Sequence, residues 1–285
     1  MNHHLCGRWG IMSKPRADWD WNTYYRWLKE GRGTGEGKDY LVWLTIHDLA
    51  SRGIVSRILG MKTGRMHHLF SGLETALFYI LDASDLVLDI REQFPLLLLE
   101  ETLRIAKEIN VRHPRDSVSK FPYVFTSDFV VTTQEGIKVL SVKPESELEK
   151  LRVREKLAVE QRYWEEKGIE WRLVTDKIID FQKARNLEWI GRSWDFCKRV
   201  PAGRSPDEIL DSFLLIYENS YKSVAQIAEE IENRFRLEPG FGITTFQYLL
   251  RQKRIIIDLS SPLDLVSPRV GNGKGGCYSW IETYA

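Results

Sequence analysis

The chain has 285 residues, of which 43% are hydrophobic and 28% charged, and its formal net charge is +1. This composition is typical of a globular protein with a substantial core, and it excludes a disordered chain. A basic surface for nucleic acid would have to be local, because the whole molecule is nearly neutral. The longest apolar run, Phe94 to Leu99, is too short to cross a membrane, so we expect no membrane partner.

The cysteines and the N-terminus indicate where the protein works. Cys6, Cys197 and Cys277 are too far apart for a zinc ribbon or a disulfide framework, and such usage suits a reducing cytosol. The N-terminus lacks the long apolar segment of a signal peptide. We therefore expect a cytoplasmic protein.

The first 45 residues are rich in glycine, arginine and tryptophan, and we expect an irregular arm with one short helix at Trp21–Lys29. The glycine-rich stretch 30–38 invites comparison with a phosphate-binding loop. That motif would need glycine at position 32 and serine or threonine at position 39, where the chain has Arg32 and Asp39. A flexible connector is the better interpretation.

Regular patterns begin after Ser71. Apolar residues at helical spacing predict a helix over 72–83, and alternation predicts a strand over 86–94, followed by a helix over 97–110. Residues 123–133 and 137–143 are expected to form two strands joined by a turn at 134–136. A long helix at 145–167, capped by Gly168, and a strand at 169–175 complete an α/β core with helices on both faces.

The last third of the chain is expected to be helical. Segment 202–206 marks a break, after which helices are predicted at 206–217, 224–235 and 244–253 and a strand at 254–259, a pattern that indicates a winged helix. We divide the chain into an N-terminal arm (1–45), an α/β domain (46–184), a winged-helix-like domain (185–260) and a flexible tail (261–285).

Asp128 and Lys143 lie on the two strands of the predicted hairpin. With the turn at 134–136, paired positions sum to about 269–271, so Asp128 faces Ser141 or Lys143. Facing side chains lie roughly 5 Å apart, so the three groups can share one patch. A carboxylate beside an ammonium at the end of core strands suits a hydrolytic site. The plainer alternative is a cross-strand ion pair, worth about 0.2–1 kcal/mol.

Glu74 is a second candidate carboxylate, in the first turn of the helix that precedes the strands. Ser71-Gly-Leu-Glu74 also fits the S-x-x-E capping box, in which the glutamate only satisfies the helix end. Both interpretations of Glu74 remain open on the local sequence alone.

Several stretches between roughly residues 30 and 180 resemble a known family. They are Gly35-Glu-Gly-Lys-Asp-Tyr40, His67-His-Leu-Phe-Ser-Gly-Leu-Glu74, Leu88-Asp-Ile-Arg-Glu-Gln-Phe-Pro-Leu96, Thr126-Ser-Asp-Phe129, Val142-Lys-Pro144 and Arg162-Tyr-Trp164. Together they resemble the TnsA family of endonucleases, which implies a restriction-endonuclease-like PD-(D/E)xK core with a mixed sheet. Over the last third the chain matches only the general plan of that family.

The resemblance implies a Mg²⁺-dependent DNA endonuclease, with Mn²⁺ as a substitute, that cuts the 5′ ends of a bacterial transposon. It implies two protein partners: a TnsB-type transposase for the 3′ ends, and a TnsC-type AAA+ ATPase that couples both to target selection. Carried over, Glu74 and Asp128 would bind the metal ion and Lys143 would be the catalytic lysine. These types suit Mg²⁺, which prefers oxygen ligands and keeps several waters.

One position departs from the family pattern. Two residues before the lysine the family usually has Asp, Glu or, in some members, Gln, whereas this chain has Ser141, a weaker metal ligand. Glu160 on the following helix could supply an outer-shell carboxylate, or it could lie on a solvated helix face. The departure leaves a DNA- and partner-binding scaffold without catalysis as the alternative function. A free-standing restriction-like nuclease is the third.

Further residues are candidates for DNA contacts. They are His67, Arg91 and Gln93 near the expected site, and Thr244, Thr245, Gln247, Arg251, Lys253 and Arg254 on or after the third C-terminal helix. The alternatives are a buried hydrogen-bonding histidine, an internal ion pair for Arg91, and a C-terminal helix that docks onto another protein.

Overall fold

The computed structural model describes residues 19–48 and 54–269, so Cys6, Cys277 and most of the predicted tail lie outside the described residues. Helix α1 (Trp21–Lys29) confirms the first prediction: Asp20 caps it by accepting a 2.7 Å hydrogen bond from the Thr23 amide. A short 3₁₀ turn, η1 (Gly37–Asp39), follows. No helix in the described ranges is long and apolar enough to span a membrane.

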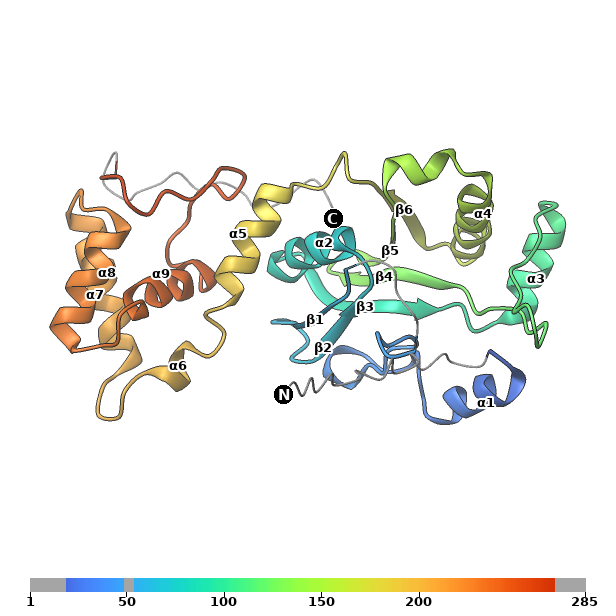
Figure 1. The fold of residues 1–285 in the computed structure, drawn as a ribbon, viewed down its shortest axis with the longest axis horizontal. Helices are drawn as coiled ribbons and strands as arrows, with labels where there is room; N and C mark the ends of the chain where they lie inside the picture. The colour runs from blue at the N-terminus through green and yellow to red at the C-terminus, as the bar shows by residue number, and fades with distance from the viewer. Residues whose placement is uncertain (1–18, 49–53, 270–285) are drawn as a thin grey trace, which may run out of the picture.

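A four-stranded mixed sheet forms the centre of the molecule (Figure 1). Its order is β3 (Val87–Pro95), β4 (Thr126–Thr133), β5 (Gly136–Val142) and β6 (Glu170–Val174). The first three strands are antiparallel, and β6 runs parallel to β5. The predicted mixed sheet is therefore confirmed.

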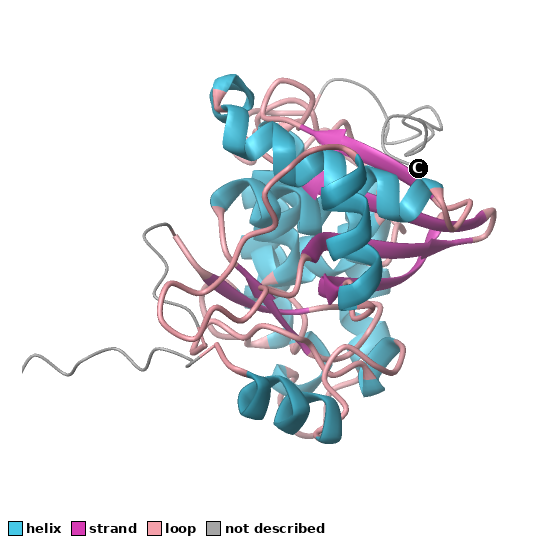
Figure 2. Cartoon of the chain, turned by 90° about the vertical axis from the view of Figure 1, so that its right-hand side faces the viewer, coloured by secondary structure: helices cyan, strands magenta, loops and turns pink. Residues whose placement is uncertain are grey.

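Alternating residues of the central strands feed two separate cores. Phe129 and Leu140 pack with helix α2 (Gly72–Ala83) on one side, whereas Val130 and Val139 pack with α3 (Leu99–Glu108) and α4 (Leu151–Glu165) on the other. This is the period-two pattern of a strand buried on both faces. Figure 2 shows helices on both sides of the strands. Helix α4 starts later than predicted, because the 3₁₀ turn η2 (Glu145–Glu149) precedes it.

A small antiparallel hairpin of β1 (Ser56–Leu59) and β2 (Met66–Leu69) was not expected from the sequence. Its strands have only four residues each and carry Arg57, His67 and His68. Such short, mixed-polarity strands give little periodic signal. The hairpin contacts both α2 and β3, which places it beside the main sheet.

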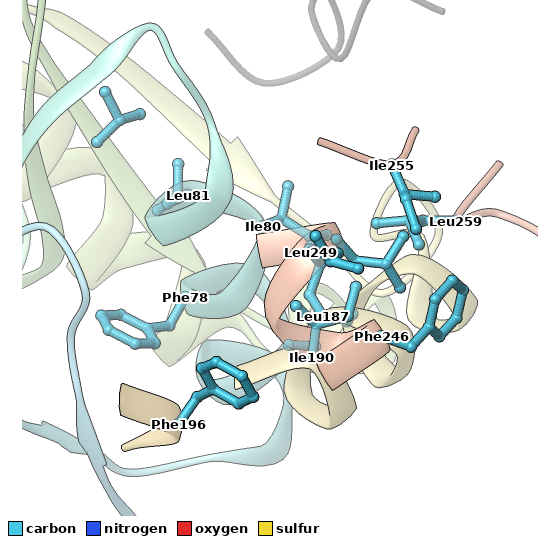
Figure 3. Close-up of a cluster of buried hydrophobic side chains, with 14 of the residues drawn as sticks. Phe78, Ile80, Leu81, Leu187, Ile190, Phe196, Phe246, Leu249, Ile255 and Leu259 are labelled. Atoms are coloured by element: carbon cyan, nitrogen blue, oxygen red, sulfur yellow. The ribbon is translucent and has the colours of Figure 1, made fainter. Parts of the chain in front are cut away.

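Five helices follow the sheet. They are α5 (Phe181–Gly191), α6 (Phe196–Arg199), α7 (Pro206–Asn219), α8 (Val224–Phe235) and α9 (Phe241–Arg251). Side chains of α2, α5, α6 and α9 join one continuous core, of which Figure 3 shows a part. Because α5 contacts both α2 and α9, the boundary predicted between residues 184 and 185 falls inside a helix that connects the two parts. The domain division stays a prediction.

The strand predicted at residues 254–259 is wrong. Ile255 and Leu259 are buried against the helices, and the amides of Arg254 and Ile255 bond back to the Leu249 carbonyl. Asn186 holds the following segment by donating to the carbonyl oxygens of Leu259 and Ser261 at 2.8 Å. The apolar residues of this segment are therefore used for packing on helices, and residues 254–259 form no wing strand.

Candidate active site

Asp128 lies at the start of β4, where the hairpin register brings it beside Ser141. Phe129 pairs with Leu140, so the paired numbers sum to 269, within the predicted range. The Val142 amide donates to Asp128 Oδ2 at 2.6 Å, and Lys143 Nζ donates to the same oxygen at 2.9 Å. The expected patch of carboxylate, hydroxyl and ammonium therefore forms.

Lys143 is anchored at the point where β5 ends. Its amide donates to the Val174 carbonyl at 3.0 Å, and its ammonium also donates to the Val142 carbonyl at 2.8 Å. Burial lowers the pKa of Lys143, but the charge of Asp128 outweighs it, and the net pKa is raised. The ammonium is therefore kept charged, and the Lys143 side chain is 34% exposed.

Glu74 caps its helix and also faces the site, so the two interpretations of this residue are compatible. Ser71 caps α2 by accepting from the Glu74 amide at 3.1 Å, and the Glu74 carboxylate accepts from the Ser71 hydroxyl at 2.9 Å and the Phe70 amide at 2.9 Å. Gln93 Nε2 reaches the same carboxylate from β3, at 3.2 Å. Burial, followed by the charge of Asp128, raises the pKa of Glu74 to about 7.

Glu160 is buried beneath Ser141, which rules out the solvated helix face. The Ser141 hydroxyl donates to Glu160 Oε1 and accepts from Trp171 Nε1 at 3.2 Å. Burial, followed by the charge of Asp128, raises the pKa of Glu160 to about 7. Position 141 therefore has a hydroxyl in place of the acidic side chain of the family pattern, and this hydroxyl is hydrogen-bonded to the Glu160 carboxylate on α4.

The site holds more negative than positive charge. The charge of Asp128 raises the pKa of both Glu74 and Glu160. Lys143 is the cation that interacts with all three carboxyl groups. Oxygen donors with an excess of negative charge fit a hard divalent cation such as Mg²⁺. Within residues 19–48 and 54–269, no group of three His, Cys, Asp or Glu side chains is already gathered as a metal cage. Lys143 instead pairs with Asp128.

Comparison with known families decides the relationship. A family model described as "TnsA-like endonuclease N terminal" matches residues 84–176, and one described as "TnsA endonuclease C terminal" matches residues 179–259. The chain is 42% identical over 182 residues to the "Transposon Tn7 transposition protein TnsA" of Escherichia coli. The chain belongs to the TnsA endonuclease family. The aligned part is 63% of this chain and 66% of that relative, just under two thirds.

The matches to the TnsA family include most of the candidate site. Asp128, Ser141, Lys143 and Glu160 lie within the residues matched by the N-terminal model, whereas Glu74 precedes them by at least ten positions. The junction between the two matched segments, at residues 177–178, is separated by two residues from α5, which begins at Phe181.

Three polar residues predicted to contact DNA are buried in this TnsA-family chain. His67 is fully buried and its Nδ1 lies 2.8 Å from Glu92, so the predicted DNA contact is wrong in this structure. Arg91 is also buried, 3.5 Å from Asp89 and 3.1 Å from the Thr132 hydroxyl, as the alternative of an internal ion pair required. The Gln93 amide contacts Glu74, not solvent.

The polar side chains of α9 that were predicted to contact DNA also point into the molecule. Thr244 and Thr245 donate to the carbonyl oxygens of Gly240 and Phe241, four residues earlier, and Gln247 donates to the Trp189 carbonyl at 2.8 Å. All three are buried, so the sequence-based assignment to DNA contact is wrong for them. Arg251, Lys253 and Arg254 reach the surface, although Lys253 pairs with Asp85 and Arg254 with Asp211.

A groove of about 660 Å³ lies between the β1–β2 hairpin, the end of α2, and helices α5 and α9. Its lining includes the cations Arg57, Lys62, Arg192, Arg251 and Lys253. Sequence reasoning missed the first two because it missed the hairpin that carries them. The five cations of the groove therefore come from the hairpin, which precedes both matched segments, and from the segment that the C-terminal model matches.

Proposed function

We propose that this TnsA-family chain is a divalent-metal-dependent DNA endonuclease that cuts the 5′ ends of a transposon. The convergence of Asp128, Lys143 and Glu74 at one end of the mixed sheet supports this proposal most directly. The mixed sheet, with these groups at one end of it, supports the PD-(D/E)xK core that we propose for this chain. The Escherichia coli relative is named as a transposition protein, which supports the substrate.

The side chains divide the work of phosphodiester hydrolysis. Asp128 and Glu74 would hold the metal ion, with Ser141 and Glu160 behind them in the outer shell. When bound, a Mg²⁺ or Mn²⁺ ion supplies a polarised water and stabilises charge on the phosphate. Lys143 leaves Asp128 and donates to a phosphate oxygen or orients the attacking water.

The partners follow from the family. We propose a TnsB-type transposase that handles the 3′ ends and a TnsC-type ATPase, both acting with this chain on transposon DNA in the bacterial cytoplasm. Helices α7, α8 and α9 support the three-helix part of the proposed winged helix. Since α9 buries its polar face, that part of the chain contacts partners or DNA through its surface cations.

Strand-specific cleavage tests the proposal. The complete chain is assembled with its transposase, ATPase and end-labelled transposon DNA, and the 5′ cuts are read on a sequencing gel. We expect Asp128→Asn and Lys143→Ala to abolish the 5′ cuts while the 3′ cuts persist. Exposed residues supply the matched controls Asp207→Asn and Lys107→Ala. Normal 5′ cleavage by either site variant, with thermal unfolding unchanged, would reject the assignment.

A scaffold without catalysis is the second candidate, favoured by the hydroxyl at position 141 and by the ion pair that occupies Asp128. Calorimetric titration with Mn²⁺ separates the two functions. An endonuclease binds Mn²⁺ at a stoichiometry that Asp128→Asn abolishes. A scaffold shows no such binding and makes no 5′ cut in the assembled complex.

The groove is our proposed path for the DNA backbone on the flank of the cut. Three of its cations, Arg57, Lys62 and Arg251, join no ion pair within residues 19–48 and 54–269, and Arg251 Nη1 is buried without a hydrogen-bond partner there. Arg192 is 3.5 Å from Glu188, and Lys253 pairs with Asp85. Asp82, Asp85 and Glu188 line the groove as well, so five cations and three carboxylates leave it a formal charge of +2, and a groove of net positive charge suits phosphate oxygens.

A further inference from the structure

Gln93 has an unusual backbone conformation within an otherwise regular strand. Its φ is +48°, in the left-handed region, although it lies inside β3. The flanking residues keep their pairing, Glu92 with Phe129 and Phe94 with Ser127, so Gln93 is directly opposite Asp128. A left-handed residue other than glycine costs folding free energy, and inside a strand, away from turns and helix ends, such strain is characteristic of functional sites.

The side chain of Gln93 is fixed at both ends of its amide. Nε2 donates to Glu74 Oε2 at 3.2 Å, and Oε1 accepts from the Thr126 hydroxyl at 3.3 Å. The residue is only 5% exposed. Gln93 therefore connects a carboxylate on α2 to the pair of strands that carries Asp128.

This connection is different from the other contacts of Glu74. Phe70 and Ser71, which also donate to its carboxylate, belong to the turn that precedes the same helix. They fix Glu74 relative to α2 and leave open where α2 sits on the sheet. Among the hydrogen bonds of the described residues, the one from Gln93 joins Glu74 to the sheet and sets its position relative to Asp128.

We infer that Gln93 is a positioning residue of the metal site, which holds Glu74 at the distance from Asp128 that a shared divalent ion requires. The inference rests on the proposed function. An amide suits this task because it donates a hydrogen bond without neutralising the carboxylate, so the site keeps its negative charge for the cation. An arginine or lysine at the same place would compete with that cation.

Two substitutions that keep the left-handed backbone test the inference. Gln93→Gly and Gln93→Asn both accept a positive φ, but neither side chain reaches Glu74. We expect Mn²⁺ affinity, measured by calorimetry without DNA, to fall about 10- to 100-fold, the usual effect of removing an outer-shell hydrogen bond. The melting temperature is measured alongside and checks that both variants fold, because a backbone free of strain offsets the loss of the two hydrogen bonds of the amide. Rates of 5′ cleavage should fall in parallel.

Asn110→Gly is the matched control, since Asn110 has a φ of +56° just after α3 and makes no contact with the site. It should leave Mn²⁺ affinity unchanged. A structural role alone for Gln93 predicts the reverse pattern, with a lower melting temperature and unchanged Mn²⁺ affinity in the folded protein, and that result would overturn the inference. If the unmodified chain binds no Mn²⁺ at all, the proposed function fails together with it. Wild-type binding that Gln93→Gly leaves intact rejects the role of Gln93 alone.

Discussion

Two clusters of buried carboxyl groups adjoin β3, and the pKa values of Glu92 in one and Glu160 in the other are shifted in opposite directions. Glu92 is completely buried, yet its pKa is lowered to about 2, because hydrogen bonds and charge from His67 and Arg65 outweigh the burial. Glu160 is almost as buried, and its pKa is raised to about 7 by that burial and by the negative charge of Asp128. The difference lies in the neighbours, since burial alone raises the pKa of both carboxyls.

The comparison separates structure from function within one fold. The Glu92 cluster is balanced by charges of this chain: Arg65 donates to both oxygens at 2.8 and 2.5 Å, and the Tyr40 hydroxyl donates to the backbone carbonyl at 3.1 Å. The site around Asp128 has one ammonium for three carboxyl groups, and the raised pKa values of Glu74 and Glu160 reflect their burial and this shortage of positive charge. Uncompensated buried charge of this kind is what a metal-binding site requires and what a structural cluster avoids.

Breaking the balanced cluster should have the largest effect on stability. Glu92→Gln leaves the Arg65 guanidinium with a neutral partner inside the fold, and we expect a loss of about 3–5 kcal/mol in the free energy of unfolding at pH 7. Denaturant titration measures it. The exposed Glu229→Gln on α8 is the control and should stay within about 0.5 kcal/mol of wild type. A Glu92→Gln variant as stable as this control would show that the cluster contributes nothing net.

The same variant has a defined pH signature. The folded pKa of Glu92 lies below its ordinary value of 4.5, so its stabilisation is present above about pH 4.5 and is lost as the pH falls toward about 2. The stability gap between wild type and Glu92→Gln should narrow over that window. A gap that widens on acidification would contradict the charge assignment of the cluster.

Moving a carboxylate within the site around Asp128 should have a smaller effect than Glu92→Gln, and a second substitution should reverse it. Glu160→Gln removes the carboxylate behind Ser141, and we expect Mn²⁺ affinity and 5′ cleavage to fall about 10- to 100-fold. The double variant Ser141→Asp, Glu160→Ser returns a carboxylate to the strand position and should recover most of the loss. The single variant Ser141→Asp, which retains Glu160, is the control that adds a carboxylate instead of moving one. If the double variant is no better than Glu160→Gln, the two positions do not act as one unit.

The sequence predicted the hairpin site well, because antiparallel pairing from a known turn fixes which residues face each other. Asp128 beside Ser141 and Lys143 needed only the turn at 134–136. The position of Glu160 was harder to predict, because a helix of mixed polarity does not indicate that one of its glutamates lies beneath a serine of the neighbouring strand. The same holds for Gln93, whose left-handed backbone has no signature in a stretch that otherwise alternates like a strand.

The errors in the C-terminal part have a common physical cause. Thr244 and Thr245 were predicted to form an exposed polar surface. Threonine hydroxyls on a helix can instead donate to carbonyl oxygens four residues earlier, and such side chains can be buried. The apolar run from Arg254 read as a strand on β-propensity, yet Lys253, with a φ of +56°, ends α9 and turns the chain back onto the helical core. Tertiary packing decided both cases.

The smallest expected effect concerns the groove, where the charge excess is positive. Alanine at Arg57, Lys62 and Arg251 should weaken binding to duplex DNA several-fold at low salt. It should also reduce the slope of log affinity against log salt by about 0.9 for each phosphate that the protein no longer neutralises. Fluorescence anisotropy at several salt concentrations measures both, and melting temperatures check that Arg251→Ala folds. A triple variant of exposed cations on other elements, Lys29→Ala, Lys107→Ala and Arg112→Ala, is the control and should keep the wild-type slope.

The length of the DNA sharpens this test, because Glu74 and the groove lie at opposite ends of α2. Its 12 residues span about 18 Å at roughly 1.5 Å per residue, which is about five base pairs. Duplexes that extend beyond the cut site by fewer base pairs than this on the groove side should bind wild type and the groove variant equally. A difference that persists on the shortest duplexes would mean that these cations contact DNA at the cut itself. If both triple variants have equal salt slopes on long DNA, the DNA backbone does not run along the groove.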